Sequence, residues 1–245
     1  METPESRFLM KVKKEYASLR RNSKSIANPN MSINYRAYVN HTVLQMAVYF
    51  GHEEFVSDLL RMGANVNIVT CHWGTALHVA VAERRKSITK KLIKAGANVN
   101  KIGSKNYCTP IYNALMTSTF QHSIIEALLH NGVDLNDMCV KTLTNAGDLT
   151  PLEVAIYNKK PTIVAALLNY NANVNRININ KQTPLDFAAG SSLIENIIKR
   201  HIVKMKAAGF EIIESNQSYE YFYCNSFCIL LSSGYTALAL KLNNK

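Results

Sequence analysis

The chain has 245 residues, of which 47% are hydrophobic and 18% charged, and its 28 Lys and Arg against 17 Asp and Glu give a net charge of +11. These proportions are typical of a folded globular protein, so they exclude a largely disordered, collagen-like or low-complexity chain. The positive charge permits an anionic partner without selecting one, and we expect it mainly to keep the protein soluble.

The cysteines give no sign of a metal site. Their five positions are Cys71, Cys108, Cys139, Cys224 and Cys228. They are odd in number and widely spaced, and no CxxC pair is joined by a second pair or by a histidine pair at zinc-site distance. We therefore expect no bound metal, reduced thiols and an intracellular protein of the cytoplasm or nucleus.

No segment has the character of a secretion signal or a membrane span. The first residues include Glu2 and Glu5 and lack the apolar run of a signal peptide. The longest apolar-rich stretch, residues 219–231, is interrupted by polar residues and is shorter than the ~20 residues that cross a bilayer. We expect a soluble protein that does not contact membranes.

Residues 1–33 are expected to form a basic amphipathic helix followed by a linker rich in Asn and Ser. Phe8, Val12, Tyr16 and Leu19 fall on one helical face, and lysines and arginines occupy the remaining surface. We interpret this helix as an amino-terminal cap for the units that follow. The alternative is a basic helix that acts on an anionic membrane or on RNA.

Two short motifs recur along residues 34–198. The first reads GANVN or a close variant at residues 63–67, 96–100, 132–136 and 171–175. The second begins at Thr42, Thr75, Thr109, Thr150 and Thr183, with spacings of 33, 34, 41 and 33 residues. Two motifs in a fixed register predict stacked repeats. The predicted units are 34–67, 68–100, 101–136, 137–175 and 176–198.

Each unit is predicted to contain two helices. A threonine followed by proline in three copies is a strong helix start, and Thr42 with Gln45 and Thr150 with Glu153 have the spacing of a capping box. A second helix follows, with apolar residues at helical spacing and a glycine or asparagine that ends it in the left-handed conformation. The chain between units must then project as a finger or hairpin.

This motif pair resembles the ankyrin repeat. The resemblance implies an all-α solenoid of five repeats with projecting hairpin fingers and helical end caps. The third copy has two extra residues between its helices, and the finger entering the fourth copy is long, so we expect these insertions to alter the binding surface. The fifth copy is about three residues short and is expected to be degenerate.

The segment after the repeats resembles a second module. Residues 198–208 are similar to the opening of the PRANC module, an F-box-like tail that follows ankyrin repeats in poxviral and parasitoid-wasp proteins. The resemblance implies a helical extension over 199–214 that docks on the linker subunit of a cullin–RING ubiquitin ligase. The docking residues would be Ile198, Ile202, Val203 and Met205. Alternatively, these residues only cap the last repeat. Residues 215–245 no longer follow the module, and we assign them no structure.

Nothing in the sequence indicates catalysis. The seven histidines have no acid or nucleophile at recurrent spacing, and no glycine-rich phosphate loop is present. His78 stands in the fourth place of its Thr motif, where its ring can bond to the Thr75 hydroxyl and to neighbouring backbone. We predict that the protein is not an enzyme and needs no cofactor.

The candidate partner surface consists of residues that vary while the repeat framework stays constant. Trp73 lies in a finger, where a packed repeat has no core to bury it, and Tyr107 has the same offset from the next threonine. The other candidates are Tyr49, Arg84, Arg85, Tyr157, Lys159 and Lys160. Tyrosines and cations together suit an acidic or phosphorylated segment. Alternatively, Trp73 packs on its neighbouring finger and the lysines are simply solvated.

These observations predict a monomeric, non-catalytic scaffold that binds a protein with its fingers and inner helices. Two mechanisms remain open: a substrate adaptor for a cullin–RING ligase, and a stoichiometric blocker that resembles the ankyrin inhibitors of NF-κB-type transcription factors. A third reading is nucleic-acid binding through the basic surface, which would weaken steeply with salt.

Overall fold

The computed structural model describes residues 41–103, 108–116, 121–136, 149–178 and 181–212, together with residues 7, 10, 11, 14, 36 and 37. Two short strands, β1 (Arg36–Ala37) and β2 (His41–Thr42), pair antiparallel, with Arg36 opposite Thr42 and Ala37 opposite His41. This hairpin leads directly into the first helix of the repeats.

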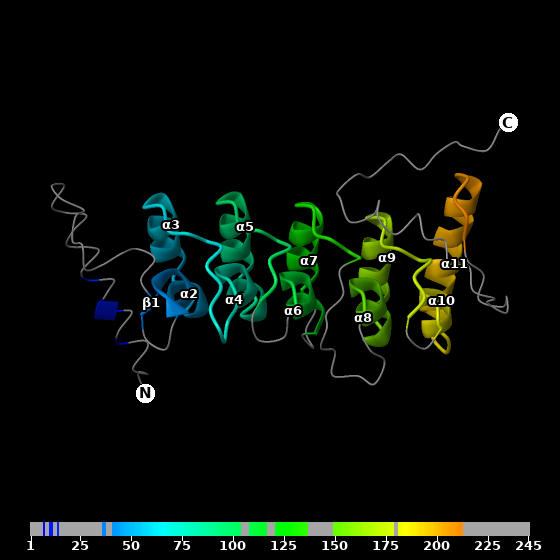
Figure 1. Ribbon diagram of the computed structural model, residues 1–245, viewed down its shortest axis with the longest axis horizontal. Helices are drawn as coiled ribbons and strands as arrows, with labels where there is room; N and C mark the ends of the chain where they lie inside the picture. Colours follow the sequence, from blue (N-terminus) through cyan, green and yellow to red (C-terminus); the bar gives the residue numbers. More distant parts are fainter. Residues whose placement is uncertain are drawn as a thin grey trace, which may run out of the picture. The chain divides into compact units, whose positions relative to one another are not determined.

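Five helix pairs follow along the described residues. The first helices are α2 (Val43–Tyr49), α4 (Ala76–Ala82), α6 (Pro110–Met116), α8 (Pro151–Tyr157) and α10 (Pro184–Phe187). The second helices are α3 (Glu53–Arg61), α5 (Lys86–Lys94), α7 (His122–Leu129), α9 (Pro161–Asn169) and α11 (Ser192–Ala207). Each helix contacts its own partner and the equivalent helix of the next pair, so the helices form two rows (Figure 1). The predicted all-α solenoid is confirmed.

The first helices approach closely because their shared face is narrow. The leucine or isoleucine at the third motif position is buried in the first four copies, and the alanine at the sixth position is buried in all five. Leu77 and Ala80 of α4, for example, are completely inaccessible to solvent. Small side chains let neighbouring helices pack tightly, and the buried residues of all pairs form one continuous core.

The capping boxes predicted at Thr42 and Thr150 are confirmed. Thr42 Oγ1 accepts a hydrogen bond from the backbone N–H of Gln45 at 3.1 Å, and Gln45 Oε1 accepts one from the N–H of Thr42 at 2.9 Å. Thr150 and Glu153 form the same reciprocal pair. Two further boxes join Thr75 to His78 and Thr183 to Asp186. Their side chains satisfy donors that a helix start otherwise leaves unpaired.

The recurrent asparagines hold successive repeats together. Asn67 Nδ2 donates to the Gly96 carbonyl at 3.1 Å, and Asn67 Oδ1 accepts from the N–H of Asn98 at 2.8 Å. Asn100 makes the same two contacts with the next repeat, to Gly132 and Asp134. The conserved register of the first motif therefore has a physical cause, since its last residue is an inter-repeat hydrogen-bond bridge.

The fifth pair departs from the others as expected, but its missing residues fall in the first helix and not in the inter-helix turn, which covers residues 188–191 against 50–52 and 83–85 in the first two pairs. Helix α10 has four residues where the other first helices have seven, and α11 is a single helix of 16 residues. Ile194 and Ile198 of α11 are buried, and Asn175 Nδ2 donates to the Glu211 carbonyl at 2.8 Å just beyond it. Helix α11 thus completes the fifth pair, and the expected boundary between residues 198 and 199 falls inside it.

The expected end segments lie largely outside the described residues. Residues 7, 10, 11 and 14 are helical, but Phe8, Val12, Tyr16 and Leu19 of the predicted apolar stripe are not described, and neither are residues 215–245. Among the helices that are described, none combines the length and apolar character that crossing a membrane requires.

The turns between paired helices that the structure describes in full each contain a residue in the left-handed conformation, and in two of them this residue is not glycine. Gly51 has φ 73°, whereas Arg84 and Lys159 at the same place have φ 55° and 51°. A side chain in this region is strained by about 1 kcal/mol or more, part of which a glycine relieves. We expect Arg84→Gly to raise the free energy of unfolding by up to about 1 kcal/mol in chemical denaturation.

The control for this prediction is Lys90→Gly, which also removes an exposed cation but lies inside α5. There glycine is expected to lower the free energy of unfolding by about 1 kcal/mol. A loss of stability in Arg84→Gly as large as that in Lys90→Gly would contradict the argument from backbone strain.

Candidate functional site

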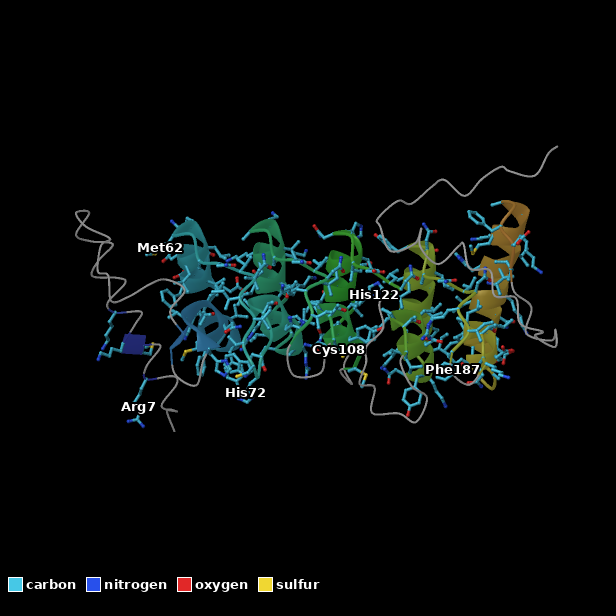
Figure 2. The ribbon with its side chains drawn as sticks, viewed as in Figure 1. Arg7, Met62, His72, Cys108, His122 and Phe187 are labelled. Carbon is cyan, nitrogen blue, oxygen red and sulfur yellow. The ribbon has the colours of Figure 1, made fainter. Side chains whose placement is uncertain are left out.

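The fingers that precede α4 and α6 are closed by backbone hydrogen bonds immediately before these helices. Thr70 and Gly74 exchange backbone hydrogen bonds of 2.9 and 3.1 Å, and the N–H of Gly103 donates to the Cys108 carbonyl at 2.9 Å. Figure 2 shows His72 and Cys108 on the side of the first helices, away from Met62 at the end of α3. The fingers and first helices therefore make up one face of the described repeats.

In the first three repeats the fourth residue of the threonine motif fixes the next finger in place. Gln45 Nε2 donates to the Gly74 carbonyl at 2.7 Å, and Tyr112 Oη donates to the Leu149 carbonyl at 2.6 Å. In the second repeat His78 Nε2 lies 3.0 Å from the Cys108 carbonyl. Each bond reaches the residue just before the next threonine, so the helix start of one repeat positions the finger of the following one.

The predicted role of His78 is confirmed and extended. Its Nδ1 lies 2.9 Å from the Thr75 hydroxyl and accepts from the N–H of Thr75 at 3.1 Å. Because the Cys108 carbonyl can only accept, Nε2 carries the proton of a neutral ring. Burial lowers the pKa of His78 below 6.5, and the bond to Cys108 opposes that shift only in part.

The fourth repeat replaces this neutral bond by a buried ion pair. Glu153 cannot donate to a carbonyl, and its Oε2 instead pairs with Nη1 of Arg176. The Glu153 side chain is fully buried, that of Arg176 is 17% exposed, and Glu153 Oε1 has no hydrogen-bond partner. This pair was not predicted from the sequence, although a glutamate at the position of Gln45 and His78 was the signal for it.

Trp73 does not project freely, so the expectation that its finger has nothing to bury it is wrong. Its ring stacks on His41 at 3.7 Å with an interplanar angle of 12°, and on Tyr49 at 4.8 Å and 19°. It is partly buried, whereas Tyr49 remains 39% exposed. Trp73 therefore packs on neighbouring residues, and these come from β2 and α2 of the preceding repeat.

A hollow of about 190 Å³ opens beside this aromatic stack. Residues of three repeats line it, among them Tyr49, His72, Trp73, His78, Glu83 and Asn113. Glu83 is exposed at the end of α4, and no described residue pairs with its carboxylate. The hollow thus combines the exposed ring of Tyr49 with one carboxylate, a setting that suits a positively charged side chain.

Sequence reasoning missed several residues of this hollow. Asn113 was detectable, because the fifth motif position holds Met46, Val79, Val154 or Phe187 in the other copies. His72 and Glu83 carry no such signal, since their positions vary in every repeat. Tyr107, expected to stand beside Trp73, lies outside the described residues.

The remaining predicted contacts do not form one patch. Arg85 is not a free cation, because Nη2 donates to the Tyr49 carbonyl at 3.1 Å and its guanidinium packs against Gly51, where an added Cβ would lie 2.7 Å away. Arg84 is exposed in the turn between α4 and α5. Tyr157 ends α8, and Lys159 and Lys160 lie in the turn that follows it, two pairs further along.

The predicted ligase-docking residues are placed unequally. Ile198 is completely buried in the core, so it is not available to a partner. Ile202 and Met205 are half-buried and pack against the core, whereas Val203 is 65% exposed. The helical register explains the correction, because Ile194 and Ile198 share the face that α11 turns towards α9.

The cysteines differ from the expectation of five reduced thiols. Cys71 is free and exposed, but Cys108 is disulfide-bonded. The expectation of a reduced thiol is therefore wrong at Cys108.

Comparison with known families identifies the repeats. The family models described as "Ankyrin repeats (3 copies)" and "Ankyrin repeat" match residues 16–103 and 44–139, and residues 147–179, respectively. These matches together cover more than half of the 245 residues. The chain belongs to the ankyrin repeat family. Ankyrin repeats mediate protein–protein interaction and are typically non-catalytic scaffolds.

Several ankyrin repeat proteins are similar to this chain. It is 30% identical over 166 residues to the nuclear factor NF-kappa-B p105 subunit of Gallus gallus, a match covering 66% of this chain and 16% of that protein. It is 29% identical over 169 residues to an ankyrin repeat protein of fowlpox virus, covering 67% and 47%. It is 33% identical over 105 residues to ankyrin repeat and SOCS box protein 5 of Oryctolagus cuniculus, covering 43% and 29%. The chain thus spans less than half the length of each relative.

Proposed function

We propose that this ankyrin repeat protein holds a protein partner on the face formed by its fingers and by α2, α4 and α6. The hollow beside the Trp73 stack carries the proposal, because three repeats converge on it and each finger is fixed by a cross-repeat hydrogen bond. Preorganised loops lose little conformational freedom on binding, which favours affinity. Tyr49 and Glu83 would contact a lysine or arginine of the partner.

Charge reversal at the hollow tests this function. The variant Glu83→Lys is expected to weaken capture of the partner from cell extract by about tenfold or more, because it places like charge against the incoming side chain. Glu211→Lys, the same change at an exposed residue beyond α11, should leave capture and melting unaltered. Equal capture by both variants and the parent would remove the hollow from the binding surface.

A second proposal concerns what binding achieves. An adaptor for a cullin–RING ubiquitin ligase is supported by the PRANC-like residues of α11 and by similarity to ankyrin repeat and SOCS box protein 5. Val203 is the exposed member of the docking set, so the ligase linker subunit would bind there. The alternative, a stoichiometric blocker of a transcription factor, is supported by the similarity to the NF-kappa-B p105 subunit and needs only the repeats.

One variant separates these mechanisms. Val203→Asp is expected to abolish capture of cullin-ligase components by an adaptor, while capture of the target continues. Leu193→Asp, at an exposed apolar residue of α11 outside the docking set, is the matched control. If the parent protein captures the target but no ligase component, the adaptor proposal fails and the blocker remains.

A further inference from the structure

The second helix of the second repeat carries an unusual concentration of positive charge. Six cations occur within residues 84–94, and they line a surface groove of about 640 Å³. They are Arg84, Arg85, Lys86, Lys90, Lys91 and Lys94. The single carboxylate among the residues that line this groove belongs to Glu53 of α3. We call the exposed face formed by Arg84, Lys86, Lys90 and Lys94 the α5 basic stripe.

The carboxylate of Glu53 already contacts residues of α5. Its Oε2 accepts a hydrogen bond from Ser87 Oγ at 2.7 Å and lies 3.5 Å from Lys91 Nζ. The bond from Ser87, followed by the contacts with Lys91, lowers the pKa of Glu53 and keeps it ionised. Within the described chain, no carboxylate pairs with any member of the α5 basic stripe.

The stripe is unfavourable for the helix that carries it. Lys86, Lys90 and Lys94 are spaced four residues apart, so like charges face one another along one side of α5. Lys86 also lies in the first turn, which contains no acidic residue, although the amino-terminal end of a helix disfavours cations. An anion bound along this face would relieve both repulsions, so the stripe has the electrostatic character of a binding surface.

We propose that the α5 basic stripe binds a short acidic segment of a protein partner, through carboxylates or phosphoryl groups. From Lys86 to Lys94 the stripe extends about 12 Å along the helix, which matches three or four residues of extended chain. The neighbouring helices carry Glu54 on α3 and Glu126 on α7, both exposed. These carboxylates would repel a long nucleic acid or an anionic membrane that extended beyond α5, so a short segment fits better.

Fluorescence anisotropy at low salt with two labelled peptides tests the proposal. One peptide carries four consecutive glutamates, and the other has two phosphoserines in place of two of them. The triple variant Lys86→Gln, Lys90→Gln, Lys94→Gln of the full chain is expected to bind both about tenfold more weakly or worse. The control triple variant Lys11→Gln, Lys199→Gln, Lys204→Gln loses the same net charge from other helices and should bind nearly as the parent does.

Other outcomes overturn the proposal. Equal losses in the two triple variants would mean that net charge alone attracts the peptides. Tighter binding of a single-stranded oligonucleotide or of phosphatidylserine vesicles than of either peptide would assign the stripe to that polyanion, and no peptide binding at low salt would leave it without this role. Glu83→Lys should not weaken peptide binding, so a failure here is distinguishable from a failure of the hollow.

Discussion

Replacing Arg176 by alanine is expected to lower the free energy of unfolding by about 3 kcal/mol, because it strands the charge of Glu153 in the core. The Glu153 side chain is fully buried, and one of its oxygens already lacks a hydrogen-bond partner. Arg176 keeps 17% of its side-chain surface exposed, which places the loss at the lower end of the range for a broken buried pair. Urea denaturation followed by circular dichroism measures it.

The interface between the first and second repeats suggests how this loss can be repaired. In Glu153→Gln the amide oxygen can still accept from the N–H of Thr150, and the amide nitrogen can donate to the Gln182 carbonyl, as Gln45 does to Gly74. The double variant Glu153→Gln, Arg176→Ala should therefore return to within about 1 kcal/mol of the parent. If Arg176→Ala alone changes stability by less than about 0.5 kcal/mol, the buried pair contributes nothing.

The second large effect is the loss of folding stability at acidic pH. Burial lowers the pKa of His78 below 6.5, so the unfolded chain binds a proton at this ring more readily than the folded protein does. The stability that neutral His78 supports is therefore complete above pH 6.5 and is lost as the pH falls through the lowered pKa. The loss from this single group is at most about 1.4 kcal/mol per pH unit.

His78→Gln isolates that contribution. Glutamine makes both the cap and the cross-repeat bond in the first repeat, so the variant should lie within about 1 kcal/mol of the parent at neutral pH. Burial also lowers the pKa values of His41 and His201, and both variant and parent share their effect. Between pH 7.5 and 5 the parent should lose more stability than the variant. Equal losses of stability in the parent and the variant would mean that protonation of His78 does not destabilise the folded protein.

The repeat architecture could be predicted because its signals are local and periodic. Thr42, Thr75, Thr150 and Thr183 each begin a helix where the motif places one, and the bond between His78 and Thr75 follows from their spacing. Such features need only the few residues around them. The degenerate fifth repeat was visible in the same way, as missing residues between its threonine motif and α11, although these residues are missing from α10 and not from the turn.

The candidate sites could be predicted only in part, because they depend on contacts between repeats. Trp73 is covered by His41 and Tyr49, which stand 32 and 24 positions earlier and carry no motif that points to it. The α5 basic stripe can be read from the spacing of its lysines, but the engagement of Glu53 with Ser87 requires the packing of α3 on α5. Ile198 was misjudged because α11 continues the repeat stack further than its sequence match suggested.

The stacking of Trp73 on His41 has a spectroscopic consequence. Trp73 is the one tryptophan in the chain, and its ring lies between a histidine of β2 and a tyrosine of α2. Indole fluorescence therefore reports only on the first two repeats, whereas circular dichroism averages over all five helix pairs. In a linear array whose units contact only their neighbours, the separation of these two unfolding transitions measures how strongly the amino-terminal end is coupled to the rest.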